Sequence, residues 1–136
     1  MESAARGTAA PLADLSGTTA LVAGASRGIG RAVAIGLARS GAAVAGLARS
    51  ADALEQLGAE IGAEGGQFLA VEADIADVAR IPDLVEEVWS WRGAIDGLLN
   101  SAGTTNRKSS LDITAEEWDR LFDVNLKGAF FLTREV

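Results

Sequence analysis

The stretch TALVAGASRGIG, residues 19–30, decides the fold of this chain. An apolar run typical of a buried strand passes directly into a glycine-rich turn, and an amphipathic helical pattern follows over 28–39. Glycines let the backbone turn tightly and let a ligand come close to it. The start of a helix offers unpaired N–H groups and a positive dipole end, where a pyrophosphate can sit. The stretch predicts a dinucleotide-binding turn, although glycine spacing alone is also typical of a tight turn without a ligand.

The alternation of strand and helix continues along the whole chain. The expected strands cover 19–24, 43–48, 67–72 and 95–100, and the expected helices cover 28–39, 51–64, 77–91 and a last stretch from Thr114, which has capping-box spacing with Glu117. Strands that alternate with helices imply a parallel sheet with right-handed crossovers. The expected fold class is α/β, a truncated Rossmann-type doubly wound parallel sheet with strand order 3-2-1-4. In the helix 28–39 we expect Ile29, Val33 and Leu37 to share one inward face.

Length and composition limit the function classes. A chain of 136 residues fits one domain, and we expect 1–15 to be a loose N-terminal tail and 16–136 to be the N-terminal part of a dinucleotide-binding domain. The net charge of −7 argues against nucleic acid as a partner. The sequence has no Cys and no His, so we expect no metal site. No apolar run approaches the roughly 20 residues of a membrane span, and the expected location is the cytoplasm.

The residues at the end of the second expected strand indicate which dinucleotide cofactor the chain prefers. Dinucleotide-binding proteins often place an acid there to hold the ribose hydroxyls of NAD, but this chain reads Leu47-Ala48-Arg49-Ser50. A guanidinium at Arg49 suits a 2′-phosphate, and Arg27 in the glycine turn can reach the same group. The alternative is that both arginines are solvated surface charges. The pattern favours NADP over NAD.

Two further segments lie at the expected carboxyl edge of the sheet. The fourth strand ends in Asn100-Ser101-Ala102-Gly103, whose small residues let a backbone approach a ribose. Asp74 follows the third strand, where a lone Asp is otherwise typical of a cap or turn. In a doubly wound sheet the carboxyl ends of the strands line the ligand crevice, so we expect both segments to lie there.

These motifs together resemble the N-terminal half of a short-chain dehydrogenase/reductase, with matching elements from about Ser16 to Val136. The family's Thr-Gly-x-x-x-Gly-Ile-Gly is similar to 23–30, and its Asn-Asn-Ala-Gly is similar to 100–103. Asp74-Ile75 matches an Asp followed by a small apolar residue, which contacts the adenine in the family. The segment 123–128 matches a helix whose Asn belongs to the catalytic set. The resemblance implies that the full-length form acts on a small-molecule substrate and is a homo-oligomer.

The resemblance assigns the candidate residues. The cofactor-binding candidates are Gly24, Ser26, Arg27, Gly28, Ile29, Gly30, Arg49, Asp74, Ile75, Asn100, Ala102 and Gly103, and the catalytic candidate is Asn125. By resemblance, Asn125 bends its helix, and its carbonyl holds a water on the proton-relay path. Ala23 and Ser101 depart from the family's Thr and Asn, which we expect to loosen a brace between the first and fourth strands.

The family's catalytic Tyr-x-x-x-Lys is missing, since the sequence has no Tyr at all. The expected function is therefore that of a fragment of an NADP-dependent oxidoreductase, which moves hydride between NADP(H) and an alcohol or carbonyl compound. A polar loop over 103–108 resembles family members that act on sugar acids and polyols. We expect the 136-residue chain alone to be inactive. The alternatives are a non-catalytic nucleotide-binding module, a degenerate gene product, or a relative of 3-oxoacyl-carrier-protein reductases.

Overall fold

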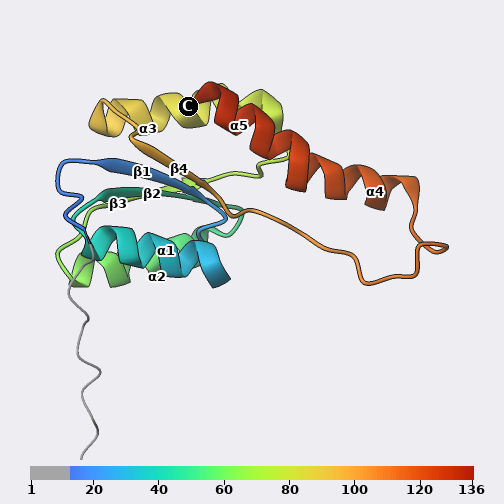
Figure 1. Cartoon of the computed structure of the whole chain (residues 1–136), viewed down its shortest axis with the longest axis horizontal. Helices are drawn as coiled ribbons and strands as arrows, with labels where there is room; N and C mark the ends of the chain where they lie inside the picture. Colours follow the sequence, from blue (N-terminus) through green and yellow to red (C-terminus); the bar gives the residue numbers. More distant parts are fainter. Residues whose placement is uncertain (1–12) are drawn as a thin grey trace, which may run out of the picture.

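The computed structural model describes residues 13–136, and its centre is a four-stranded parallel sheet (Figure 1). The strands are β1 (Thr19–Ala23), β2 (Ala43–Ala48), β3 (Phe68–Glu72) and β4 (Gly97–Asn100). Their spatial order is β3-β2-β1-β4, which confirms the expected order 3-2-1-4. All neighbouring strands are parallel, so their carboxyl ends meet at one edge of the sheet.

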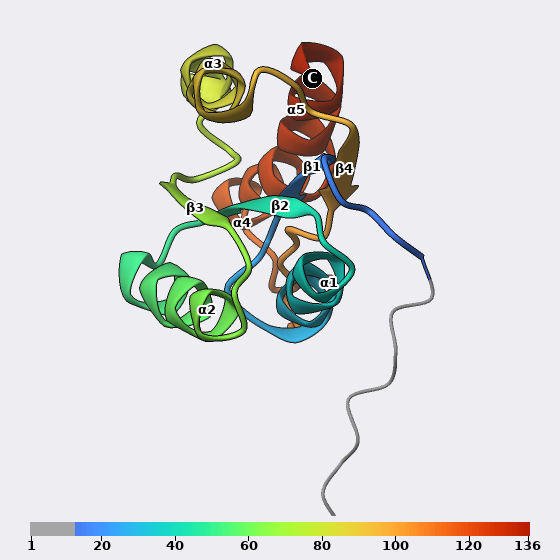
Figure 2. The ribbon, with the colours of Figure 1, turned by 90° about the vertical axis from the view of Figure 1, so that its left-hand side faces the viewer.

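Helices cover both faces of the sheet (Figure 2). The regular helices are α1 (Gly28–Arg39), α2 (Ala51–Ala63), α3 (Ile81–Arg92), α4 (Ala115–Phe122) and α5 (Ala129–Glu135). A 3₁₀ turn, Val78–Arg80, precedes α3, and a π-helical turn, Asp123–Gly128, joins α4 to α5. α1 and α2 lie on one face, α3 and α5 lie on the other, and α4 extends beyond the sheet.

Each face of the sheet has its own apolar core. On one side Leu21 and Leu47 pack with α3 and with Leu132 of α5. On the other side Val22 and Val44 pack against α1 and α2. β1 and β2 are buried along their whole length because both faces are covered, which explains their unbroken apolar sequence. Burying one such Leu contributes about 1.5–3 kcal/mol.

Some element boundaries and one helix face differ from the expected ones. The strand expected over 95–100 begins at Gly97, and the helix expected over 77–91 begins at Ile81, with Pro82 in its first turn. The inward face expected for α1 is wrong at Ile29, which is 74% exposed. α1 buries Gly30 and Ala34 instead, because small residues let it lie close to the sheet.

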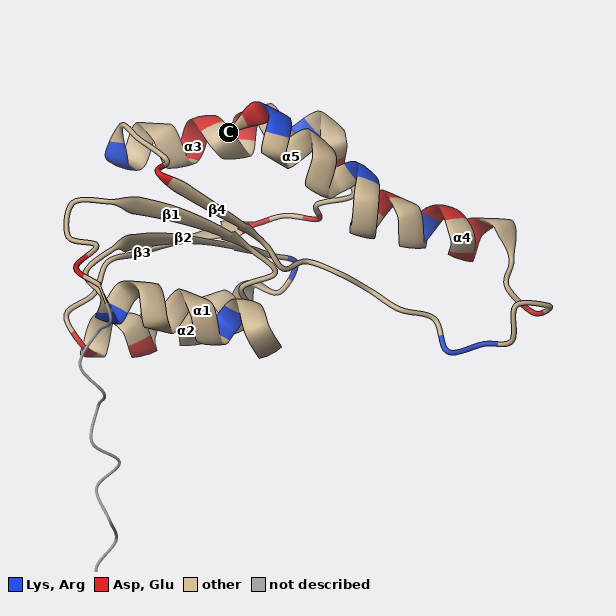
Figure 3. Cartoon of the chain, in the orientation of Figure 1, with Lys and Arg blue, Asp and Glu red and all other residues tan. Residues whose placement is uncertain are grey.

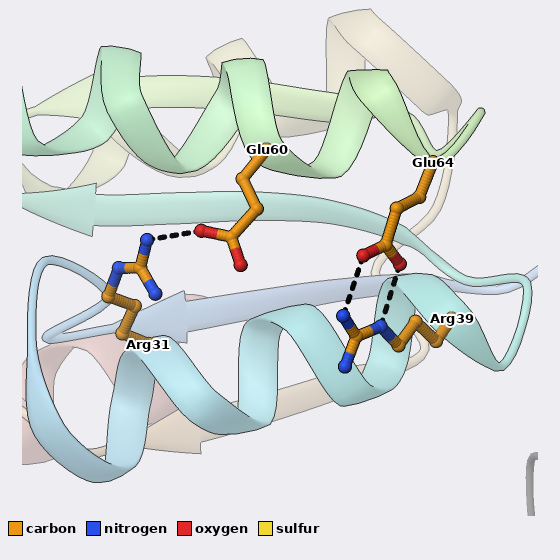
Figure 4. Close-up of polar contacts among 4 residues, drawn as sticks. All are labelled: Arg31, Arg39, Glu60 and Glu64. Atoms are coloured by element: carbon orange, nitrogen blue, oxygen red, sulfur yellow. Dashed lines mark hydrogen bonds and ion pairs between the residues drawn. The ribbon is translucent and has the colours of Figure 1, made fainter. Parts of the chain in front are cut away.

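Ion pairs on the surface join α1 to α2 (Figure 4). Arg31 pairs with Glu60, and the Arg39 guanidinium makes two bonds to the Glu64 carboxylate, of 2.7 and 2.6 Å. The hydrogen bond from Arg39 lowers the pKa of Glu64 below its ordinary value. Exposed pairs contribute little to stability, so α1 and α2 are held to the sheet chiefly by the apolar core beneath them.

The start of the described chain is tied to the fold. We expect a loose tail over 1–15, and residues 1–12 of it lie outside the described part of the chain. Leu15 donates its backbone N–H to the carbonyl of Ser40 at the end of α1, at 2.7 Å, so contacts with the rest of the fold begin before residue 16. Among residues 13–136, no helix has the length and apolar character needed to cross a membrane. The same residues hold no group of three or more acidic side chains placed to bind a metal.

Candidate functional site

A cleft of about 610 Å³ opens at the carboxyl edge of the sheet. Its walls come from the turn after β1, the end of β2, the loops after β3 and β4, and one side of α4 and the π-helical turn. The cofactor-binding candidates that line it are Gly24, Ser26, Arg27, Gly28, Ile29, Arg49, Asp74, Ile75, Ala102 and Gly103. The structure thus brings together residues that lie as many as 79 positions apart, from Gly24 to Gly103.

Two glycines of the turn are needed for close packing. Gly24 has φ +82°, and a Cβ there would stand 2.6 Å from the backbone N of Ala102. A Cβ on Gly30 would overlap the carbonyl oxygen of Gly24. Gly30 therefore does not line the cleft but lies beneath the turn, which allows α1 to start directly under it. The two glycines set the distance between the turn and the end of β4.

Gly28 has a different environment. Its φ is +57°, and a Cβ on it would meet no atom within 4 Å. The left-handed conformation favours glycine, while the open space in front of it is free for a ligand. Gly28 is also the first residue of α1, whose N-cap Arg27 makes no capping hydrogen bond with its side chain. The first N–H groups of α1 thus have no side-chain acceptor from the cap and can bind an anion.

Two exposed arginines line the cleft, Arg27 beside the glycine turn and Arg49 after β2. Within residues 13–136, neither guanidinium forms a side-chain hydrogen bond or an ion pair. Ala48, where an acid would stand in an NAD site, is buried at the end of β2. The part of the cleft wall that follows β2 therefore carries the positive charge of Arg49 and no carboxylate.

Asp74 is the acidic residue among those that line the cleft. Its Oδ1 accepts the backbone N–H of Ala76 at 3.0 Å, and its Oδ2 lies 2.9 Å from Nη1 of Arg120 on α4. Partial burial opposes ionisation, but the Ala76 hydrogen bond and the Arg120 guanidinium outweigh it, with a smaller effect of Arg49. Together they lower the pKa of Asp74 below its ordinary value. Asp74 is therefore an anionic acceptor at neutral pH.

Asn125 lies outside the cleft wall but holds part of it. Its Oδ1 accepts the N–H of Thr104 at 2.8 Å, and its Nδ2 donates to the carbonyl of Thr104 at 2.8 Å. The side chain thus pairs with the backbone after β4 as a neighbouring strand would. The helix departs from α-geometry here, because Asn125 stands in the π-helical turn. Such turns are frequent at functional sites. The water on its carbonyl stays a prediction.

Asn100 does not line the cleft. Its Nδ2 donates to Oγ1 of Thr133 at 2.8 Å, which ties the end of β4 to α5. The neighbouring backbone is regular, since Ser101 donates its N–H to the carbonyl of Ala23 at 2.9 Å. The hydrogen bond between β1 and the end of β4 is therefore present with Ala23 and Ser101 in place of the family's residues.

Several residues of the cleft were not among the candidates. They are Leu47, Ala48, Ser50, Ala53, Ala73, Ser101, Thr104, Arg120 and Val124. Most are sequence neighbours of candidates, so the strand ends already indicated them. Arg120 and Val124 reach the cleft from α4 and the π-helical turn, and only the packing of these elements brings them there. Nothing in the local sequence distinguishes Arg120 from a solvated helical arginine.

Known proteins share this fold and these motifs. The family model for short chain dehydrogenases matches residues 18–136. A probable tetrahydroxynaphthalene reductase of Zymoseptoria tritici is 38% identical over 89% of this chain and 46% of its own length. A 3-oxoacyl-[acyl-carrier-protein] reductase of Staphylococcus epidermidis is 40% identical over 87% of this chain and 49% of its own length. The chain thus spans about half the length of these curated relatives.

A solved structure gives the same result. The crystal structure of a metagenomic short-chain oxidoreductase in complex with NADP matches 90% of this chain and 56% of that chain, with a TM-score of 0.86 and 36% identity. The strand order, the glycine turn and the Asn100–Gly103 segment on the described residues agree with the family match. The chain belongs to the short-chain dehydrogenase/reductase family.

Proposed function

We propose that this chain forms the nucleotide-binding part of an oxidoreductase that transfers hydride between NADP(H) and an alcohol or carbonyl substrate. The observation that carries the cofactor choice is the pair Arg27 and Arg49, which line the cleft without an ionic partner among the described residues. The NADP complex of the metagenomic relative supports it. Bound NADP(H) would supply the hydride or accept it.

In this proposal, different residues of the cleft bind different parts of the cofactor. The N–H groups at the start of α1, beside Gly28, would hold the pyrophosphate. Arg49 and Arg27 would hold the 2′-phosphate, and Asp74 with Ile75 would contact the adenine. Asn125 fixes the backbone of Thr104 and so shapes the wall where the ribose would approach. The open face of Gly28 and the uncapped helix start fit this cofactor.

The cofactor choice is tested by calorimetric titration. The 136-residue chain is titrated with NADPH and NADH, and with adenosine 2′,5′-bisphosphate and AMP, which probe the adenosine half of the site alone. We expect the ligands with a 2′-phosphate to bind more tightly. Arg49→Ala should weaken NADPH binding by about tenfold or more and leave NADH nearly unchanged, because a charge-assisted hydrogen bond is lost.

Arg107→Ala is the matched control, since Arg107 is exposed on a loop away from the cleft. It removes one positive charge, so a general electrostatic effect would appear in both variants. Equal affinities for NADPH and NADH in the unchanged chain would overturn the NADP assignment.

We propose further that the 136-residue chain alone does not turn over substrate. Hydride transfer to a carbonyl builds negative charge on oxygen, and the sequence has no Tyr, His or Cys to supply a proton there. Lys108, one of two lysines, is already paired with Glu117. Absorbance of the reduced cofactor with polyols, sugar acids and ketones tests this. Turnover that exceeds a heat-treated control and is not lowered in Asn125→Ala would come from a contaminant, whereas turnover that Asn125→Ala abolishes would contradict the proposal.

The similarity to the Staphylococcus epidermidis reductase favours a second substrate class, 3-oxoacyl thioesters. Both classes require the same nucleotide site, so the calorimetric test applies to either. A full-length protein assayed with a sugar acid and with a 3-oxoacyl thioester would distinguish them.

A further inference from the structure

Asp74 lines the same cleft as two arginines from different elements, and only one of them contacts its carboxylate. Arg120 on α4 contacts Oδ2 at 2.9 Å. Arg49, after β2, makes no ion pair among residues 13–136, but its charge also acts on the Asp74 carboxylate. Both arginines and Asp74 line the same cleft. Arg120 is thus the ionic partner of the carboxylate, and Arg49 makes no contact with it.

The position of Asp74 is fixed by the backbone around it. Ala76 holds Oδ1 through its N–H at 3.0 Å, which leaves Oδ2 for Arg120. The following residue, Ile75, is packed against the π-helical turn, where a Cβ on Gly128 would overlap the Ile75 carbonyl oxygen. The Ala76 hydrogen bond and the close packing of Ile75 against Gly128 do not depend on Arg120, so we expect the carboxylate to stay in place if Arg120 is lost.

Removal of the Arg120 charge would leave Oδ2 of Asp74 without its ionic partner. A partly buried carboxylate without a partner is costly, and it attracts the next available cation. Arg49 is the other cation whose charge acts on it. An Arg49 side chain drawn toward Asp74 would be less available to a 2′-phosphate, and the Asp74 charge would repel that phosphate.

We propose that Arg120 is a positioning residue for cofactor specificity: by occupying the Asp74 carboxylate, it keeps Arg49 free to bind the 2′-phosphate. This inference rests on the proposed NADP preference of the site. It assigns to α4, an element outside the strand-end loops, an influence on which dinucleotide the cleft selects.

The test is the ratio of the NADH and NADPH dissociation constants, measured by calorimetry on the full 136-residue chain. Arg120→Met should lower the preference for NADPH by about fivefold to tenfold, because one charge-assisted bond of Arg49 is diverted. Arg120→Lys keeps a cation beside Asp74 and should retain most of the preference. A merely structural role of Arg120 would weaken NADPH and NADH alike and leave their ratio unchanged.

The double variant Arg120→Met with Asp74→Asn separates the two ways in which Arg120 could act. If Arg120 works by occupying Asp74, then Arg120→Met changes the ratio little when Asp74→Asn is already present. If Arg120 instead bound the phosphate directly, the loss would persist in the double variant, and the inference would be overturned. Arg120→Gln serves as a second variant if urea unfolding shows that Arg120→Met is not folded.

The outcomes also separate this inference from the proposed function. An unchanged chain that prefers NADPH, with a ratio that Arg120→Met and Arg120→Gln leave unaltered, overturns the role of Arg120 alone. An unchanged chain that binds both cofactors equally, or neither, overturns the proposed function and this inference with it.

Discussion

At the scale of single residues, the glycine turn combines packing with ligand access. Gly24 and Gly30 approach other backbone atoms too closely to carry a side chain, whereas Gly28 faces open space. The three glycines belong to one short turn, but their roles differ because only Gly24 and Gly30 pack closely against other atoms of the turn and of the segment after β4.

Gly30→Ala should destabilise the chain by about 1–3 kcal/mol, because its Cβ would overlap the Gly24 carbonyl and force the turn to shift. Gly36→Ala is the matched control in the same helix, where a Cβ would meet nothing within 4 Å. It should stabilise the chain by about 0.5–1 kcal/mol, since glycine is unfavourable inside a helix. Urea unfolding followed by circular dichroism gives both values. Equal effects of the two substitutions would contradict the packing role of Gly30.

The residues that sequence reasoning placed well are those with a short-range signal. Glycines next to an apolar run, and small residues at a strand end, indicated most of the cleft wall, with Gly30 and Asn100 as exceptions. Ile29 was expected to face inward from its spacing with Val33 and Leu37, but the packing of Gly30 and Ala34 decides the rotation of α1. Periodicity of large residues fails there because close contact with the sheet requires small ones.

At the scale of elements, α4 begins with a complete capping box, as the sequence indicated. Thr114 Oγ1 accepts the N–H of Glu117 at 3.2 Å, and the Glu117 carboxylate accepts the N–H of Thr114 at 3.0 Å. Glu117 also pairs with Lys108 from the loop before the helix. The side-chain bond from Lys108 and the backbone bond from Thr114 lower the pKa of Glu117 below its ordinary value of 4.5.

The lowered pKa of Glu117 determines how the stability of the chain depends on pH. The contribution of the Glu117 carboxylate is present above its unfolded-state pKa, and it is lost as the pH falls through the lower folded-state pKa. Glu117→Gln should therefore destabilise the chain near neutral pH, and the difference in urea midpoint from the unchanged chain should shrink below about pH 4.5. Glu116→Gln removes the same charge in the same turn of α4 without a capping contact. A pH-independent difference for Glu117→Gln would contradict the role of the carboxylate.

The π-helical turn shows where element prediction from sequence stops. The pattern from Thr114 onward predicted one helix, and the structure has α4, the π-helical turn and α5 in its place. The widened turn places Asn125 against the Thr104 backbone and Gly128 against Ile75. These contacts are long-range, so no local propensity indicates them. The resemblance to a family indicated that Asn125 is special, but not which backbone it binds.

At the scale of the whole molecule, charge and apolar surface are unevenly distributed. Acidic residues are prominent on the ribbon of α3 and α4 (Figure 3). Alongside them, the α4–α5 face consists of Trp118, Phe122, Leu126 and Phe130, which recur every four residues and are 43–61% exposed. Trp118 and Phe122 stack on each other with ring centroids 4.6 Å apart. Phe131, next to Phe130 in α5, is half-buried against the core and is not part of this face.

The α4–α5 face and the edge of the sheet lead to a prediction about association. Within residues 13–136, β4 pairs with β1 alone, so its other edge has unpaired backbone groups. Exposed large apolar side chains and an open strand edge both favour contact between copies of the chain. We therefore expect the purified 136-residue chain to self-associate, with a mass by light scattering that rises with protein concentration.

Substitutions identify the surface responsible. Phe130→Glu places a charge in the α4–α5 face and should shift the chain toward the monomer, because burying that carboxylate between copies is costly. Leu111→Glu is the matched control: Leu111 is 93% exposed on the loop before α4, so the change adds the same charge outside the face. If association came from net charge alone, the two variants would respond alike. A monodisperse monomer at every concentration, with cooperative unfolding, would show that the exposed face and strand edge are compatible with an isolated chain.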